Sequence, residues 1–315
     1  MSAASKRILT GLQPSGDLHI GNYFGTIKPT IELFEENSGF LMVADYHALT
    51  SSKDAEALRS NIIENAKDYL AAGLNLENAS LFQQSSVPEH TELAWIFDCL
   101  VTVPFLMQSH AYKDKIAKGL EANAGLFTYP MLMAADILLY DTDLVPVGED
   151  QRQHVEYARE AASKFNNTYG QTFKEPKELI SKTVGVVPGT DGQKMSKSYK
   201  NTIPLFSSRE EIQKAVMSIV TDSSGERPEN VYAIHRLYRE ETDLAALYES
   251  NKGKYQALKE SLAEDIDAFV APMREKRANI SDNDVKRVLK DGGEKARAVA
   301  SATMQKIREK IGVII

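Results

Sequence analysis

Two short stretches of the sequence carry residues suited to holding an anionic ligand. The first, Thr10–Asn22, follows the apolar pair Ile8-Leu9 and leads into apolar residues spaced three and four apart. This order predicts a strand, a glycine-rich loop and a helix, whose first N–H groups can bind an anion. His19 and Asn22 lie three residues apart, so both face one side of the first helical turn. The same pattern is also typical of a loop that only reverses the chain.

The second stretch, Gln193–Ser198, holds two lysines three residues apart together with two serines. It follows the turn Pro188–Gly192, whose glycines predict a flexible connection. Two interpretations are open at this point. The lysines belong to a phosphate site, or the stretch is an ordinary surface loop, because Lys and Ser favour solvent.

A third candidate is Asp136, in the middle of the apolar segment Phe127–Tyr140. Apolar residues continue around nearly every face of this segment, which predicts a buried helix, and Pro130 suits its N-terminus. An ionised carboxylate inside such a helix is costly unless it is hydrogen-bonded. Its partner is either an Arg or Lys elsewhere in the chain or an N–H or O–H of a substrate.

The segment Val145–His154 places two acids directly after a predicted strand end at Gly148. Glu149 and Asp150 are suited to the first turn of the helix that follows, where they complement the helix dipole. They are equally suited to accept hydrogen bonds from ribose hydroxyls, with Gly148 allowing a nucleotide to approach closely. Both interpretations stay open.

The elements that must position these residues alternate between strands and helices. Continuous apolar runs predict strands at 39–44, 80–84, 144–147 and 184–187, and amphipathic spacing predicts helices at 54–70 and 88–100. This βαβα order predicts an α/β fold with a doubly wound, Rossmann-like parallel sheet, whose ligands bind at the carboxyl ends of the strands.

From about Leu205 the pattern is helical without predicted strands, and the stretch from Lys286 to Lys310 is locally basic. We therefore expect an α/β catalytic domain at 1–204 and an all-helical domain at 205–315, whose last helix is free to pack back on the first domain. For any single residue of the basic stretch, a solvated helix face is the favoured explanation.

Composition restricts the kind of protein. The chain has 315 residues and a net charge of −7, from 37 Lys and Arg against 44 Asp and Glu. This balance argues against binding to nucleic acid by bulk charge, so an RNA contact must depend on a local basic patch. The one cysteine, Cys99, excludes an intramolecular disulfide framework. We expect an intracellular enzyme, because the start lacks a secretory signal pattern and no apolar run approaches the roughly 20 residues that span a bilayer.

Both signature stretches together, in this order, resemble the paired signatures of class I aminoacyl-tRNA synthetases. The first is a variant, His19-Ile20-Gly21-Asn22 with Asn in the last place, and the second, Lys194–Ser198, is a full match. The wider set resembles the bacterial branch of that family that is specific for tryptophan, over the first two thirds of the chain: Gly11–Asn22, Asp45–Thr50, Tyr129–Tyr140, Val145–His154 and Lys194–Ser198. The last third is similar but less diagnostic.

The resemblance implies that L-tryptophan reacts with ATP to give tryptophanyl-adenylate and pyrophosphate, and that the amino acid is then transferred to tRNA(Trp). It implies Mg²⁺ as the ATP complex with no metal site in the protein, a helical domain that reads the anticodon, a homodimer and a cytoplasmic location. It implies no contact with DNA or membranes. The reaction needs no covalent nucleophile, so catalysis is mostly positioning and charge stabilisation.

The resemblance also assigns roles to residues. The catalytic set is His19, Asn22, Lys113, Lys115, Lys194 and Lys197. The ATP set is Gln13, Pro14, Ser15, Gly21, Asn22, Gly148, Glu149, Asp150, Val186, Val187, Lys194, Met195, Ser196, Lys197 and Ser198. The tryptophan set is Gln13, His47, Tyr129, Met133, Asp136, Val145, Val147 and Gln151, in which Asp136 accepts the indole N–H. Two stretches depart from the family pattern, Val103–Met107 and Val186–Gly192.

Three alternatives remain. A tyrosyl-tRNA synthetase shares the fold and both signatures, but the segment Tyr129–Tyr140 matches the tryptophan form. A nucleotidylyltransferase of the same superfamily explains the first loop but neither the lysine signature nor the helical C-terminal part. A non-catalytic tRNA-binding paralogue is disfavoured by the intact Asn22, Asp136, Lys194 and Lys197. Exchange between ATP and pyrophosphate, measured with each amino acid, distinguishes them all.

Overall fold

The fold centres on a five-stranded parallel sheet in the order β3-β2-β1-β4-β5. The computed structural model describes residues 6–119, 121–147, 152–180, 186–221 and 227–314. The strands are β1 (Arg7–Leu12), β2 (Ser38–Val43), β3 (Ala79–Gln83), β4 (Leu144–Val147) and β5 (Lys177–Ile180). The chain moves outward from β1 to β3 and then returns to the other side of β1, so the predicted doubly wound sheet is confirmed.

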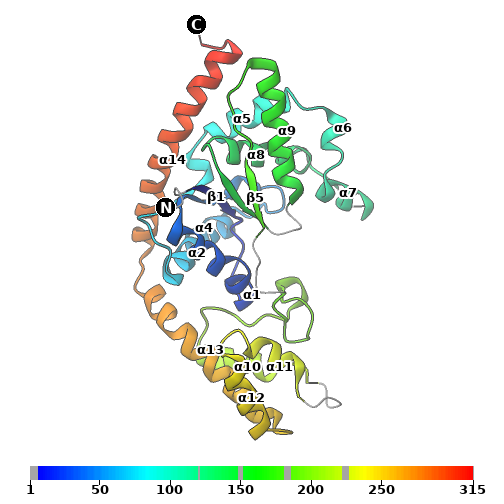
Figure 1. Cartoon of the computed structure of the whole chain (residues 1–315), viewed down its shortest axis with the longest axis vertical. Helices are drawn as coiled ribbons and strands as arrows, with labels where there is room; N and C mark the ends of the chain where they lie inside the picture. Colours follow the sequence, from blue (N-terminus) through cyan, green and yellow to red (C-terminus); the bar gives the residue numbers. More distant parts are fainter. Residues whose placement is uncertain (1–5, 120, 148–151, 181–185, 222–226, 315) are drawn as a thin grey trace.

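Helices connect the strands and cover the sheet on both sides (Figure 1). The segment after β1 is continuous: α1 (Ile20–Asn22), the π-helical turn η1 (Tyr23–Ile27) and α2 (Lys28–Glu36). The other helices of the α/β part are α3 (Asp45–Ala48), α4 (Ala55–Ala72), η2 (Gln84–Ser86), α5 (Glu89–Asp98), α6 (Val103–Leu106), α7 (His110–Ala117), α8 (Ala124–Leu138), α9 (Arg152–Tyr169) and η4 (Lys197–Tyr199). The C-terminal part contains α10 (Arg209–Met217), α11 (Glu229–His235), α12 (Glu241–Ser250), α13 (Tyr255–Ala278) and α14 (Asp282–Ile311).

Alternating residues of the strands belong to two separate apolar cores. Leu41 and Val43 of β2 pack in a core with α2 and α4, whereas Phe40 and Met42 pack in a second core with α5, α8 and α9. This division follows from the two-residue period of a strand, which sends neighbouring side chains to opposite faces. Strands buried on both faces explain why the sequence shows continuous apolar runs.

Two expectations from the sequence are wrong. The last described strand is at Lys177–Ile180. Of the strand expected at 184–187, Val184 and Gly185 lie outside the described residues, and Val186 and Val187 are not in a strand. Pro130 lies inside α8 and does not begin it, because Asn123 caps the helix earlier by accepting a hydrogen bond from Leu126 N. The loss of one backbone hydrogen bond at a proline is tolerated in this buried helix.

The final helix, α14, returns from the C-terminal helices and packs against β3, an edge strand of the sheet (Figure 1). Gly292 permits this approach, since a Cβ on it would lie 1.9 Å from the carbonyl oxygen of Leu81. Farther along, Ser301 donates to Glu89 Oε1 at 2.6 Å. The helix thus covers an edge that would otherwise offer unpaired backbone groups.

A cluster of charged residues joins α4 to the junction between α13 and α14. Arg277 of α13 donates to Glu64 Oε2 and Asp68 Oδ1, each at 2.5 Å. Lys67 donates to Asp282 at 2.8 Å. Helices α10 to α13 lie at the opposite end of the molecule from α5 to α9 (Figure 1). Among the described helices, we find none with the length and apolarity needed to cross a membrane.

We expect Gly292→Ala to destabilise the protein by about 3 kcal/mol, because its Cβ meets backbone rather than a movable side chain. A Gly→Ala change inside a helix otherwise gains about 1 kcal/mol. Gly293→Ala is the control: its Cβ would meet Ser86 Oγ at 2.7 Å, and this hydroxyl can rotate away at the loss of one hydrogen bond, to Gln83 O. Thermal and urea unfolding measure both variants, and equal stability of the two would contradict the packing described for α14.

Candidate active site

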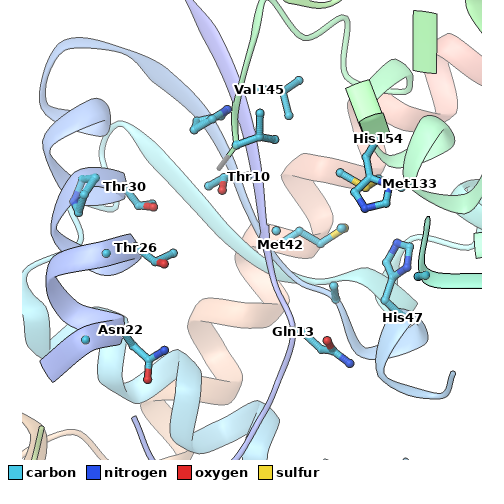
Figure 2. A pocket seen from close by; sticks show the side chains of 18 of the residues that line it. Thr10, Gln13, Asn22, Thr26, Thr30, Met42, His47, Met133, Val145 and His154 are labelled. Atoms are coloured by element: carbon cyan, nitrogen blue, oxygen red, sulfur yellow. The ribbon is translucent and has the colours of Figure 1, made fainter. Parts of the chain in front are cut away.

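A cavity of about 980 Å³ opens at the carboxyl ends of the central strands. Figure 2 shows Asn22, Thr26 and Thr30 on one wall, from the helical segment after β1, and His47, Met133 and His154 on the other. β1 lies between β2 and β4, so the cavity lies where the strand order reverses. Doubly wound sheets bind ligands at this point, and the volume is in the range of a cofactor-sized site.

His19 and Asn22 close the first turn of the helical wall by capping one another. Asn22 N donates to His19 Nδ1 at 3.3 Å, and His19 N donates to Asn22 Oδ1 at 3.1 Å. Burial, together with the positive charge of Lys197, lowers the pKa of His19 from 6.5 to about 4. The ring is therefore neutral at pH 7, with Nδ1 as acceptor and Nε2 left to carry the proton.

The two signature stretches meet in space. Lys197 Nζ donates to Gly16 O at 2.8 Å and to Ser15 O at 3.4 Å. Burial lowers the pKa of Lys197, although Asp17 and Asp68 counteract this. The second stretch thus presents its cation at the loop of the first, as phosphate binding requires.

Asn201, which the sequence analysis missed, organises the second stretch. Its Oδ1 accepts from Ser196 N at 2.8 Å, while its Nδ2 donates to Asp191 Oδ1 at 2.7 Å and to Lys194 O at 3.1 Å. The side chain is 2% exposed. A buried Asn beside a lysine-rich loop is a signal for such a role, since a buried amide must be hydrogen-bonded.

Asp136 is buried, as predicted, and its partners are imidazoles and an amide. His47 Nε2 lies 2.8 Å from Oδ2, and Gln84 Nε2 donates to the two oxygens at 2.8 and 3.0 Å. His90 Nδ1 makes a close contact of 2.6 Å with Oδ1, and His90 Nε2 lies 2.7 Å from Tyr140 Oη. Among the described residues, the partners of Asp136 are therefore histidines and a glutamine, and not the Arg or Lys that the sequence left open.

Burial by itself would raise the pKa of the Asp136 carboxyl, but His90 and His47 outweigh it and hold the pKa far below its usual range. The group is therefore an ionised acceptor at the edge of the cavity. Gln84 and His90 were missed in the sequence. Gln84 was detectable, because it is the last residue of a predicted strand and therefore lies at the ligand-binding edge.

Aromatic and apolar side chains complete the wall near Asp136. The ring centroid of Tyr129 lies 6.3 Å from that of His47 and 5.4 Å from that of His154. Burial raises the pKa of Tyr129. Further residues expected from the sequence also line the cavity: Gln13, Gly21, Met133, Val145, Val147, Val186, Val187, Lys194, Met195, Ser196 and Ser198.

Some expected residues are not in this lining. Lys113 and Lys115 lie on α7, which reaches the cavity only through Ala111 among its described residues. Pro14, Ser15 and Lys197 lie beside the cavity rather than in its wall, although Ser15 and Lys197 contact each other. Four expected residues, Gly148, Glu149, Asp150 and Gln151, lie outside the described residues.

Comparison with known proteins agrees with this geometry. Residues 1–283 match the family model described as tRNA synthetases class I (W and Y). The chain is 46% identical to a tryptophan–tRNA ligase of Fusobacterium nucleatum, over 98% of each chain, and 46% identical to one of Campylobacter jejuni, over 98% of this chain and 100% of that one. A crystal structure of Campylobacter jejuni tryptophanyl-tRNA synthetase, complexed with ADP and tryptophan, is similar with a TM-score of 0.91 and 45% identity, over 97% of this chain and 99% of that one.

The lowered pKa of His19 predicts a loss of stability in acid. The unfolded chain binds a proton at this residue below pH 6.5 and the folded chain only below about 4. The folded protein therefore loses stability as the pH is lowered from 6.5 to about 4. The loss is about 1.4 kcal/mol per pH unit at most. His19→Asn keeps a capping acceptor and removes this titration. Urea unfolding at pH 7 and pH 4.5 should show a smaller loss for the variant, and parallel losses would contradict the assignment.

Proposed function

The chain belongs to the class I tRNA synthetases (W and Y), and on this premise we propose that it activates L-tryptophan with ATP and transfers it to tRNA(Trp) in the cytoplasm. The observation that carries the proposal is the buried, ionised Asp136 in a cavity whose other wall holds both signature stretches. The similar crystal structure complexed with ADP and tryptophan supports both ligands. The family resemblance deduced from the sequence is confirmed.

In the proposed first step, a carboxylate oxygen of tryptophan attacks the α-phosphorus of ATP. The bond from this phosphorus to the oxygen that bridges it to the β-phosphorus breaks, and negative charge develops on the pyrophosphate that leaves. Lys194 and Lys197 are suited to stabilise that charge, and the neutral His19 ring and Asn22 to hold the α- and β-phosphates. Mg²⁺ enters with ATP as part of the substrate. The adenylate then acylates the terminal ribose of tRNA, on its 2′-hydroxyl.

We assign the remaining nucleotide contacts by the family resemblance. Gly148, Glu149 and Asp150 hold the ribose, and Val186 and Val187 lie against the adenine. Lys113 and Lys115 reach the phosphates from α7, a helix whose Lys113 is exposed to solvent.

We assign recognition of the indole N–H to Asp136. Its oxygens already contact three side chains, so the substrate must share or replace one of them. His47 is the candidate, because its side chain is 17% exposed and lines the cavity, whereas that of His90 is fully buried. Gln84, also fully buried, donates to the carboxylate and is not part of the cavity lining. Tyr129 and Gln151 are assigned to the α-amino group.

We propose that the active species is a homodimer. Three large apolar side chains are exposed on α5 and around α6: Trp95 at 69%, Val103 at 59% and Met107 at 50%. Large exposed apolar side chains that form a contiguous patch are typical of interfaces between protein chains. We further propose that residues 205–315 form the domain that reads the anticodon, while residues 1–204 carry the catalysis.

Asp136→Ala should abolish most activation of tryptophan and its preference over phenylalanine. A site that pairs a substrate N–H discriminates by about 10⁴-fold against an analogue that lacks it, since the analogue leaves the acceptor unpaired. The measurement is kcat/KM in ATP–pyrophosphate exchange with tryptophan, tyrosine and phenylalanine.

Asp265→Ala is the matched control, because Asp265 is a carboxylate paired with His235 and Arg239 in the C-terminal helices. It should lower stability and leave the ratio of tryptophan to phenylalanine unchanged. If Asp136→Ala behaves in the same way, Asp136 is structural. If tyrosine rather than tryptophan supports ATP–pyrophosphate exchange by the wild type, tyrosine is the substrate.

Trp95→Glu should convert the dimer to a monomer, because a charge cannot be buried at the centre of an apolar contact without a partner. Sedimentation should give about twice the chain mass of 35.0 kDa for the wild type and the chain mass for the variant. Val220→Glu is the control, since Val220 is 58% exposed and lies in the other part of the chain. A wild type that is fully active at 35.0 kDa would contradict the proposal.

A further inference from the structure

A buried asparagine lies in the interior of α4. Asn65 is 2% exposed, and it lies on the same helix face as Ile62 and Tyr69. Asn is a poor helix former, and a buried amide without hydrogen bonds is costly. The apolar contacts of this helix face do not require an amide. The hydrogen-bond partners of the Asn65 side chain therefore indicate why an amide is present.

Asn65 binds both backbone groups of a single residue in the first signature stretch. Ser15 N donates to Asn65 Oδ1 at 3.0 Å, and Asn65 Nδ2 donates to Ser15 O at 3.3 Å. Because Ser15 N–H can only donate and Ser15 C=O can only accept, these contacts fix which end of the amide is oxygen. The side chain therefore specifies the position and the orientation of the Ser15 backbone.

The Ser15 carbonyl is shared with a second donor, Lys197 Nζ, at 3.4 Å. The ammonium group also contacts Gly16 O, at 2.8 Å. In the proposed reaction this ammonium turns towards phosphate and leaves the carbonyls. Among the side-chain contacts that the structure describes for Ser15, the Asn65 amide then remains.

The helix that carries Asn65 has a capped start, and its second half is tied to α13. Asp54 caps its start by accepting from Glu56 N and Ala57 N. In its second half, Arg277 of α13 binds Glu64 and Asp68. A side chain on a fixed helix can hold a loop more closely than one on another loop.

We propose that Asn65 is a positioning residue, which holds the backbone of the loop 13–16 in the geometry that binds ATP while Lys197 moves to the phosphates. This inference rests on the proposed function of the site. Asn65 acts through Ser15 and contacts no substrate itself.

The test compares ATP and tryptophan binding in full-length variants by calorimetry. Asn65→Ala should weaken ATP binding about tenfold, which corresponds to about 1.4 kcal/mol. Its Kd for tryptophan should stay within about twofold of the wild type, since the loop is at the nucleotide side. Asn61→Ala is the matched control, one turn earlier on α4, where the structure describes no side-chain hydrogen bond for the amide.

Asn65→Leu separates positioning from folding, because Leu fills the space, suits the apolar face and favours the helix. We expect the same loss of ATP affinity at an undiminished melting temperature. ATP affinity equal to the wild type in both Asn65 variants would overturn the inference. If the wild type binds ATP but shows no ATP–pyrophosphate exchange with tryptophan, the proposed function is wrong. The role of Asn65 is then still decided by the Kd for ATP of its two variants.

Discussion

The arrangement of the amino-acid side of the cavity follows from the need to keep one carboxylate ionised inside an apolar helix. Asp136 obtains its polar contacts from residues after β2, after β3 and in α5. The parallel register pairs Val43 with Gln83, so the residues that follow the two strands are neighbours. Gln84 is oriented in turn, since its Oε1 accepts from Tyr46 N at 3.2 Å while its Nε2 faces Asp136. The sheet register thus determines the electrostatics of the site.

Much of the fold could be predicted from the sequence, because patterns of two and of three to four residues report directly on burial. The first strand, the signature stretches and the buried Asp136 all follow from such local patterns. The partners of Asp136 and of Ser15 did not, because they come from segments far away in the chain. Asn65 still left a signal that was not used: an amide within the apolar stripe of α4. Pro130 misled the prediction because a proline favours a helix start but is also tolerated inside a buried helix.

The two walls of the cavity differ in how they are held. The tryptophan side depends on side chains locked in the core, such as Gln84 and His90. The nucleotide side depends on backbone groups of loops, which Asn65 and Asn201 fix through their amides. An amide can bind an N–H and a C=O at once without carrying charge, so it restrains a loop without competing with the lysines for phosphate. This difference suits a site in which one substrate is recognised by fixed side chains and the other must be held while its charge changes.

The contact between Gly292 and Leu81 has a consequence for the order in which the protein is made. A ribosome delivers the N-terminal strands first and α14 last, so the outer edge of β3 stays uncovered until nearly the whole chain has been synthesised. The apolar face that Ala296, Ala300 and Met304 later bury is exposed during the same interval. Open strand edges and apolar surfaces of this kind are where nascent chains associate wrongly. The sheet of this enzyme is therefore completed later in synthesis than a sheet that is closed by early segments of its chain.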